Sequence, residues 1–316
     1  MTAEHRPPSP DLRSSSPEPR SSSPEPRSLS PVERNPGEPP ARVLTVAGSD
    51  SGGGAGIEAD LRTFALTGVH GCVAVTAVTV QNSVGVTGFQ EITPEVVAAQ
   101  IDAVASDIGA DACKTGMLAS TPIIEAVGAA FDAAGIGHGA DRGESLIPLV
   151  VDPVCASMHG DSLLADEARG TLVDVLFPRA TLVTPNLDEV RLLTGIEVTD
   201  RAGQEAAARE LHRLGAQWAL VKGGHLRGSD RSPDLLFDGA EFYAFDAPRV
   251  DTPHDHGAGD TLAAAAASAL AHGRTVPEAV AFAKAWVTRC LEDAYPLGSG
   301  HGPVSPLWRL RAAPAV

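Results

Sequence analysis

The run His256-Gly257-Ala258-Gly259-Asp260, which leads into an alanine-rich segment, is the most specific chemical pattern in the sequence. Small residues before a helix leave several amide N–H groups pointing at one place, and the helix dipole adds to their positive field. Such a site can hold the charge that grows on a transferring phosphoryl group. Asp260 could be an ordinary N-terminal carboxylate, but the pattern favours a general base that accepts a proton from an attacking hydroxyl. We therefore expect Gly257, Ala258, Gly259 and Asp260 to be catalytic.

A second glycine-rich run extends from Gly48 to Gly56, and Asp50 is its single carboxylate. Glycines let the backbone fold tightly against a ligand, and Asp50 could accept a hydrogen bond from a substrate hydroxyl. The spacing and the missing lysine exclude a Walker A loop and a dinucleotide fingerprint. A merely flexible loop is the alternative, but the run leads directly into a predicted helix at 57–66, which favours a binding loop.

Polar residues at two other predicted strand ends suit a metal ion and a nucleotide. Asn186, with Glu189 three residues later, fits a helix capping box, and the same oxygens could organise magnesium through water. Both interpretations can hold together, because a helix N-terminus also favours anions. Lys222, beside Gly223 and Gly224, suits a pocket for nucleotide phosphates, with a surface lysine as the alternative.

The segments that must position these residues alternate between short apolar runs and helical periodicity. This alternation predicts an α/β fold with a mostly parallel central sheet and helices on both faces, in which ligands bind where strands end. Segments 235–238 and 241–245 predict a hairpin on the Asp238-Gly239 turn. The other predicted strands are 43–47, 72–80, 147–151, 181–184 and 217–221, and the predicted helices are 57–66, 94–107, 204–214, 261–272 and 277–293.

Composition limits the class of protein. The 316 residues, 43% of them apolar, can bury a large core, and no apolar run is long enough to cross a membrane. The polar, proline-rich start is not a signal peptide, so we expect a cytoplasmic protein. The net charge of −16 argues against nucleic acid as a partner, so an anionic ligand would need local cations such as magnesium. The four separated cysteines indicate buried apolar residues and not a disulfide framework or zinc site.

Residues 1–40 differ from the rest of the chain. The heptad Arg-Ser-Ser-Ser-Pro-Glu-Pro occurs twice there, starting at Arg13 and Arg20. So few apolar residues cannot offset the entropy lost on ordering, and we expect a disordered tail at 1–40 before one domain at 41–316. Its Ser-Pro pairs could be phosphorylated, although an unmodified solubilising tail is the favoured interpretation.

The motifs together resemble those of the ribokinase-like kinases, which share a Gly-x-Gly-Asp anion hole and an Asn-x-x-Glu magnesium motif. The resemblance sharpens to the hydroxymethylpyrimidine/phosphomethylpyrimidine kinases of thiamine biosynthesis, because that family's motifs recur in order between about residues 43 and 303. The matching motifs are Ala47-Gly48-Ser49-Asp50-Ser51, Val80-Gln81-Asn82, Lys114-Thr115-Gly116-Met117-Leu118, Val151-Asp152-Pro153-Val154, Thr184-Pro185-Asn186 and Lys222-Gly223-Gly224-His225.

This resemblance implies a three-layer α/β/α domain, a homodimer, and transfer of the ATP γ-phosphoryl group to a pyrimidine hydroxymethyl group and then to the resulting monophosphate. Gln81 would bind the aminopyrimidine edge, because a carboxamide is both donor and acceptor. The candidates for substrate binding are Gly48, Asp50, Asp60, Gln81, Met117 and Val154. The candidates for nucleotide binding are Lys222, Gly223 and Thr184, and those for magnesium are Asn186, Glu189 and Asp152.

Three positions depart from the family pattern. Asp260 stands where many members have Cys, Met158 where many have Lys, and Glu58 where Gln is usual. Two other functions remain open. A pyridoxal kinase shares the superfamily and also phosphorylates a hydroxymethyl group on an aromatic nitrogen heterocycle. A non-catalytic ligand-binding protein could use the same fold, but it would have no use for a base at the anion hole.

Overall fold

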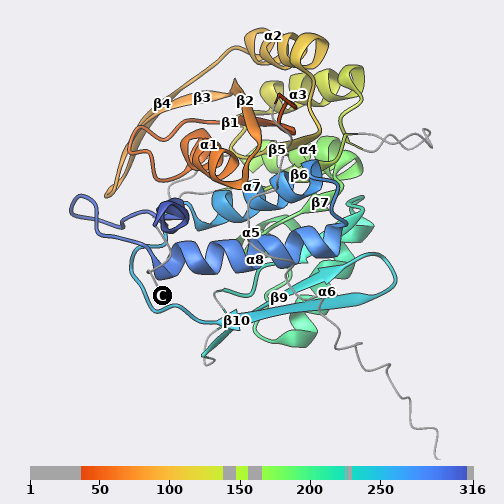
Figure 1. The fold of residues 1–316 in the computed structure, drawn as a ribbon. Helices are drawn as coiled ribbons and strands as arrows, with labels where there is room; N and C mark the ends of the chain where they lie inside the picture. The colour runs from red at the N-terminus through yellow and green to blue at the C-terminus, as the bar shows by residue number, and fades with distance from the viewer. Residues whose placement is uncertain (1–36, 138–146, 156–165, 225, 227–229, 312–316) are drawn as a thin grey trace, which may run out of the picture.

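One large sheet forms the centre of the protein (Figure 1). The computed structural model describes residues 37–137, 147–155, 166–224, 226 and 230–311. The strand order is β10-β9-β8-β7-β6-β5-β1-β2; the strands from β8 to β2 run parallel, and β9 is antiparallel to both of its neighbours, β8 and β10. The strands are β1 (Arg42–Ala47), β2 (His70–Val75), β5 (Ala112–Thr115), β6 (Leu149–Val151), β7 (Leu182–Val183), β8 (Trp218–Val221), β9 (Arg231–Phe237) and β10 (Phe242–Pro248).

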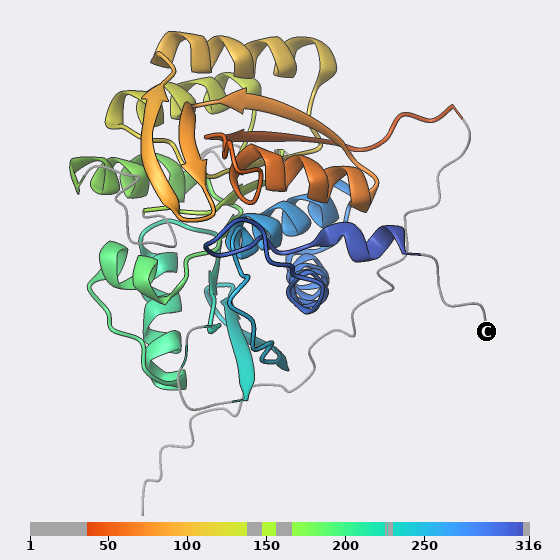
Figure 2. The ribbon, with the colours of Figure 1, turned by 90° about the vertical axis from the view of Figure 1, so that its left-hand side faces the viewer.

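Helices cover both faces of this sheet, as Figure 2 shows from the side. Side chains of the central strands alternate between two cores, so Val150 packs on one face while Leu149 and Val151 pack on the other. One face carries α1 (Gly56–Thr67), α7 (Ala258–Ala271) and α8 (Val276–Glu292). The other carries α2 (Pro94–Ala103), α3 (Thr121–Ala134), α4 (Asp166–Leu176), α5 (Leu187–Thr194) and α6 (Arg201–Arg213). The predicted three-layer α/β/α fold is thereby confirmed.

Helix α7 packs on the sheet and also against its neighbours α1 and α8. Residues Ala263 to Ala267 are all fully buried, because methyl side chains let the helix approach β-strands and helices closely. Alanine also has the highest helix propensity. The N-terminus of α7, where Asp260 lies, is therefore held in place by close packing along the helix.

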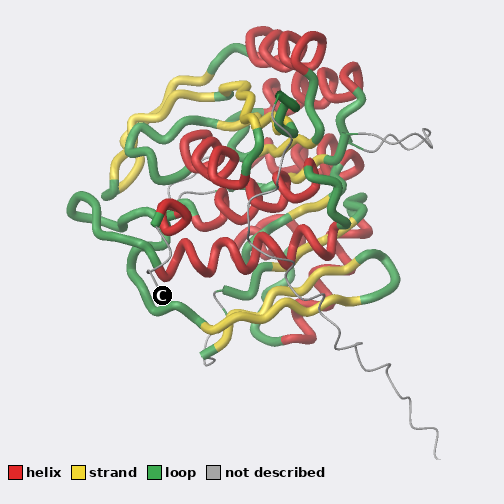
Figure 3. The backbone as a smooth tube through the Cα atoms, in the orientation of Figure 1, coloured by secondary structure: helices red, strands yellow, loops and turns green. Residues whose placement is uncertain are grey.

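A small hairpin stands apart from the central sheet (Figure 3). We predicted one strand at 72–80, which is wrong: the chain leaves the main sheet at Thr76, and β3 (Ala77–Asn82) pairs with β4 (Gly85–Glu91). Thr76 is buried, and its hydroxyl donates to the carbonyl of Met117 at 2.6 Å. Its amide donates to the carbonyl of Ala47, and its carbonyl accepts the amide of Ile92. Thr76 therefore marks the bend between β2 and β3 and belongs to neither strand.

Several other features of the sequence can be compared with the structure. The four cysteines are buried and unpaired, as expected. No helix in the described ranges is long and apolar enough to cross a bilayer. The helix predicted at 94–107 is α2 followed by a π-helical turn, Val104–Ile108. Most of the predicted tail, together with Met158 and His225, lies outside the described residues.

Candidate active site

The two glycine-rich runs contact one another at the carboxyl edge of the sheet. Gly257 has the left-handed φ of 77° and caps α7, and a side chain on it would collide with the carbonyl oxygen of Gly54. A side chain on Gly54 would in turn collide with the His256 ring. Glycine is therefore required at both positions, which brings Asp50 and Asp260 to the same site.

The first turn of α7 offers backbone amides to an anion. The amide of Ala258 donates to the carbonyl of Asp255 at 3.1 Å, and that of Thr261 donates to Gly257 at 2.9 Å. Within the described part of the chain, the amides of Gly259 and Asp260 have no protein acceptor. Two amides at a helix N-terminus are a suitable place for a phosphate oxygen. Ala258 thus contributes shape to this turn, but not its amide.

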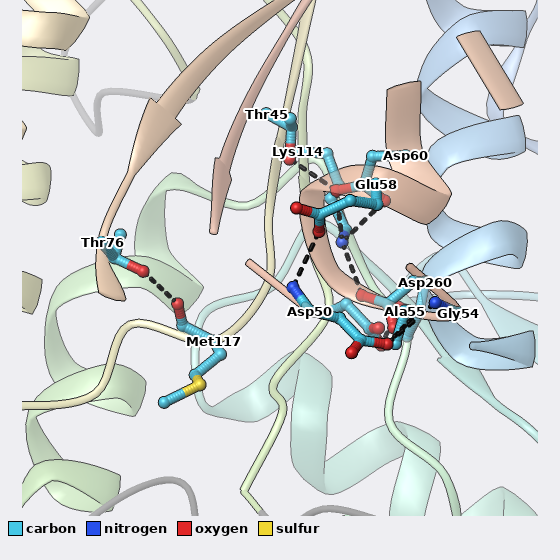
Figure 4. Close-up of polar contacts among 12 residues, drawn as sticks. Thr45, Asp50, Gly54, Ala55, Glu58, Asp60, Thr76, Lys114, Met117 and Asp260 are labelled. Carbon is cyan, nitrogen blue, oxygen red and sulfur yellow. Dashed lines mark hydrogen bonds and ion pairs between the residues drawn. The ribbon is translucent and has the colours of Figure 1, made fainter. Parts of the chain in front are cut away.

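Asp260 belongs to a group that we call the Lys114 cluster, formed by Thr45, Asp60, Lys114 and Asp260 (Figure 4). The Lys114 ammonium lies 3.0 and 2.9 Å from the two Asp60 carboxylate oxygens and 3.1 Å from Oδ1 of Asp260. Thr45 donates to Asp60 at 2.6 Å. Burial alone would lower the pKa of Lys114, but Asp60 and Asp260 outweigh this effect and raise it. Lys114 therefore stays charged.

Asp60 was expected to bind substrate, and its position argues against direct contact. Its side chain is completely buried behind Lys114, and both of its oxygens accept hydrogen bonds within the cluster. Burial raises the pKa of Asp60 to about 7, and Lys114 opposes that rise. The Asp260 side chain, in contrast, is 17% exposed, so within the cluster Asp260 is the carboxylate open to a ligand.

The carboxylate of Asp50 is also occupied by the protein itself. It accepts hydrogen bonds from the amides of Gly52, Gly54 and Ala55 and lies 2.8 Å from Nε2 of His256. Burial opposes its ionisation, but the bonds from His256 and Ala55 lower its pKa. Asp50 therefore shapes the glycine loop, and this occupancy argues against the hydroxyl contact that we expected.

Glu58 supports the same loop from α1. One of its carboxylate oxygens accepts the amide of Asp50 at 2.7 Å (Figure 4). Burial raises the pKa of Glu58. A Gln at this position could accept the same hydrogen bond through its amide oxygen, so the departure from the family pattern keeps the geometry.

Two of the candidate substrate-binding residues, Gln81 and Met117, lie beside the glycine loop. Gln81 lies at a β-bulge, half-buried, and its side-chain nitrogen is 3.4 Å from Nε2 of His256. Met117 is buried beside Gly48, where a side chain would come within 3.3 Å of the Met117 sulfur. Val154 follows β6 and is partly exposed. His256, which the sequence did not single out for substrate, thus lies close to both Asp50 and Gln81, and its Nε2 donates to Asp50.

A second group, which we call the Lys222 cluster, consists of Asp152, Thr184, Glu189 and Lys222. Oδ1 of Asp152 accepts bonds from Thr184 at 2.9 Å and from Lys222 at 3.1 Å. The Lys222 side chain is only 13% exposed, so it is not a surface lysine. Burial would lower the pKa of Lys222, but Asp152 and Glu189 raise it. Thr184 is completely buried, so its hydroxyl orients Asp152.

Glu189 and Asn186 form the predicted capping box at the start of α5. The Asn186 side chain accepts the amide of Glu189 at 2.9 Å, and Glu189 accepts the amide of Asn186 at 2.7 Å. Burial raises the pKa of Glu189 to about 7; Lys222 opposes the rise, while Asp152 and Asp260 add to it. Glu189 thus lies in a site where a further positive charge would be stabilising.

The loop after β8 is fixed by another buried ion pair. The amide of Gly223 donates to Asp234 at 2.8 Å, and Lys284 from α8 lies 2.8 Å from the same carboxylate. A side chain on Gly223 would collide with the carbonyl of Pro233. These contacts hold the backbone beside Lys222 in one position.

The donors around the Lys222 cluster suit a hard cation. Carboxylate and amide oxygens from Asp152, Asn186 and Glu189 are the ligand type that magnesium prefers. Among the described residues, no group of three His, Cys, Asp or Glu side chains is close enough to enclose a metal ion. The residues therefore fit magnesium that keeps much of its water and phosphate coordination, as is usual for nucleotide sites.

The three-layer fold is combined with a helix, α7, that begins with two amides without a protein acceptor in the described chain and with Asp260 beside a lysine. This combination is that of a ribokinase-like kinase. Solved structures agree. A pyridoxal kinase of Bacillus subtilis in its ADP complex matches with a TM-score of 0.75 at 35% identity, covering 86% of this chain and 99% of that one. A phosphomethylpyrimidine kinase from Clostridium difficile 630 matches with a TM-score of 0.67 at 35% identity, covering 78% and 98%.

Sequence comparison gives the family. Residues 50–305 match the family model described as phosphomethylpyrimidine kinase. A hydroxymethylpyrimidine/phosphomethylpyrimidine kinase of Mycobacterium leprae (strain TN) is 64% identical over 278 residues, covering 87% of this chain and 96% of the relative. The chain belongs to the phosphomethylpyrimidine kinase family.

Proposed function

We propose that this protein transfers the γ-phosphoryl group of ATP to 4-amino-5-hydroxymethyl-2-methylpyrimidine, and a second one to the resulting monophosphate, in thiamine biosynthesis. The placement of Asp260 supports this proposal most strongly. Its partly exposed carboxylate lies at the helix start whose Gly259 and Asp260 amides have no protein acceptor in the described chain. A base and an anion site at one point suit phosphoryl transfer to an alcohol.

In the first transfer, Asp260 accepts the hydroxyl proton while the substrate oxygen forms its bond to the γ-phosphorus. The bond from that phosphorus to the bridging oxygen breaks, and ADP leaves with the electron pair. The amides of Gly259 and Asp260 stabilise the charge on the transferring group, and Lys222 adds positive charge from the side of β8. Gln81 and Met117 orient the pyrimidine ring.

Magnesium belongs to this proposal as the partner of ATP. It would be held near Asn186, Glu189 and Asp152, and when bound it would neutralise phosphate charge. The raised pKa of Glu189 supports this assignment, because burial beside Asp152 and Asp260 leaves its negative charge poorly compensated. A cation at this position would relieve that repulsion.

Phosphorylation of pyridoxal is the second candidate function. The match to a pyridoxal kinase structure at a TM-score of 0.75 favours testing it, since that enzyme also acts on a hydroxymethyl group of a nitrogen heterocycle. A coupled assay of ADP release with hydroxymethylpyrimidine, its monophosphate and pyridoxal separates the two. We expect the highest kcat/KM for the two pyrimidines. A higher value for pyridoxal would reverse the assignment, and no turnover of any of them would favour a non-catalytic protein.

A homodimer in the cytoplasm, without nucleic acid, completes the proposal. Val78 and Val80 on one face of β3 are 49% and 62% exposed, so the hairpin offers an apolar contact for a second copy. The net charge of −16 argues against nucleic acid. Light scattering on the wild type and on Val80→Asp tests the dimer, since a monomeric wild type would contradict it.

A further inference from the structure

We propose that Lys114 is a positioning residue that fixes the orientation of the Asp260 carboxylate, and that Asp60 and Thr45 in turn fix Lys114. With Oδ1 of Asp260 bound to Lys114, Oδ2 is the oxygen left for the acceptor hydroxyl. This inference rests on the proposed kinase function, in which Asp260 is the base. Neither Lys114 nor Thr45 was among the site residues expected from the sequence.

The Lys114 ammonium group has three close carboxylate contacts. The group has three N–H donors, and its three carboxylate contacts are Oδ1 and Oδ2 of Asp60 at 3.0 and 2.9 Å and Oδ1 of Asp260 at 3.1 Å. The Lys114 side chain is completely buried on β5, between β1 and β6. A donor held so firmly by the sheet restricts the carboxylate that it binds.

Gly116 provides independent support for the contact between Lys114 and Asp260, because it leaves the space that this contact needs. A Cβ atom at this position would lie 3.0 Å from the Lys114 nitrogen, 3.1 Å from the Ala47 side chain and 3.8 Å from Oδ1 of Asp260. The φ angle of Gly116 is not in the left-handed region, so backbone strain does not explain the glycine. The missing side chain instead leaves space for the contact between Lys114 and Asp260.

Asp60 has a separate electrostatic task. Without Asp60, the buried side of the Lys114 charge would have no partner, and an uncompensated buried charge is strongly destabilising. Asp60 compensates the Lys114 charge from the buried side, and Thr45 holds Asp60 by a hydrogen bond of 2.6 Å. When Oδ2 of Asp260 takes the hydroxyl proton, Lys114 keeps its own proton and its pairing with Asp60.

The alternative is that Lys114 serves only to neutralise the buried Asp60. A double substitution separates these roles, because Lys114→Met alone leaves a buried charge unpaired and destabilises the fold. The variant Asp60→Asn/Lys114→Met removes both charges. We expect it to recover most of the thermal stability lost by Lys114→Met. Its kcat should remain about ten- to a hundredfold below the wild type, the range for a misplaced catalytic group, with KM little changed.

The decisive outcome is the kcat of the stable double variant. A kcat equal to that of the wild type would overturn the positioning role, and a low kcat with unchanged KM supports it. Gly116→Ala tests the same contact without removing a charge: we expect lower kcat at nearly unchanged thermal stability. Should the double variant fail to fold, a fully active and stable Gly116→Ala protein would overturn the proposal.

The assay also separates this inference from the proposed function. Every variant is compared with the wild type on both hydroxymethylpyrimidine and pyridoxal. A wild type that phosphorylates only pyridoxal would refute the pyrimidine assignment. The ratio of variant to wild-type kcat on the accepted alcohol would still decide the role of Lys114.

Discussion

The Lys114 cluster and the Lys222 cluster contain the same kinds of side chain, but the contacts of the lysine differ between them. Each combines one lysine with nearby carboxylates at the carboxyl edge of the sheet. Lys114 binds both of its neighbours, Asp60 and Asp260, within 3.1 Å. Lys222 binds Asp152 at 3.1 Å, while Glu189 accepts a backbone amide of its own capping box.

The difference indicates which half of the site is complete before a ligand arrives. In the Lys114 cluster the lysine compensates the buried charge of Asp60, and the carboxylate of Asp260 remains open to a ligand. In the Lys222 cluster the lysine bonds to Asp152, and Glu189 accepts the amide of Asn186 instead; burial raises the pKa of Glu189 to about 7, as it does that of Asp60. The first arrangement suits a positioned base, and the second suits a site that gains a cation together with ATP.

The largest expected effect tests Asp260, whose charge acts on both clusters. Asp260→Asn keeps an oxygen that can accept the Lys114 hydrogen bond but removes the proton acceptor. We expect kcat to fall at least about a hundredfold, the lower range for a general base, with KM and thermal stability little changed. Steady-state kinetics and a thermal melt measure this. Near wild-type turnover would refute the base, and Asp260→Cys tests whether a thiol can replace the carboxylate.

A smaller effect is expected at Glu189, where the clusters differ most. Glu189→Gln keeps most of the capping geometry and removes the negative charge. If Glu189 helps to hold magnesium, activity should fall about ten- to a hundredfold, as for other supports of a metal site, and recover partly with added magnesium. Titrating magnesium at saturating ATP measures this. Full activity at ordinary magnesium concentration would leave Glu189 as a cap alone.

Gln81 lies outside both clusters, so its substitution should affect substrate binding and not the phosphoryl transfer step. Gln81→Ala leaves a donor and an acceptor of the pyrimidine unpaired, which costs roughly 1–3 kcal/mol for a buried group. Because Gln81 is only half-buried, we expect the lower part of this range, about a tenfold rise in KM for the pyrimidine with kcat nearly retained. An unchanged KM would remove Gln81 from the substrate site.

The smallest effect concerns stability and pH. The raised pKa of Glu189 means that the folded protein binds its proton more tightly than the unfolded chain does. Protonation of Glu189 therefore adds to the free energy of unfolding. This contribution is fully present below pH 4.5 and is lost as the pH rises through about 7. Melting temperatures of the ligand-free protein between pH 5 and 8 should fall less in Glu189→Gln than in the wild type. Parallel curves would contradict the raised pKa, and Asp60 keeps some slope in both proteins.

The sequence predicted the parts of the site that depend on local pattern. Glycine runs at strand ends, the capping box of Asn186 and Glu189, and the alternation of strands and helices are encoded within a few neighbouring residues. Their predicted positions agree with β1, α5, α6 and α7 within a few residues. The mostly parallel sheet followed from the same alternation.

Partners far apart in the chain could not be predicted in this way. Lys114 is 54 residues from Asp60 and 146 from Asp260, and β5 is only four residues long, so periodicity gave no sign of it. The carboxylate of Asp50 was read as open because its partner His256 is 206 residues away. The hairpin was missed because β2 and β3 are separated by a single residue, Thr76, whose bend depends on Met117.

The chain has only three lysines, Lys114, Lys222 and Lys284. Each forms an ion pair with a nearly buried aspartate or aspartates, so the positive groups on the described surface are guanidinium groups and not amines. Reagents that acylate amines, including reactive acyl phosphates, therefore meet few side chains on this protein. Lys222, at 13%, has the most exposed of the three lysine side chains. Acylation of lysine would thus begin at Lys222, and if the proposed nucleotide site is correct, ATP should protect this amine and its acylation should inactivate the enzyme.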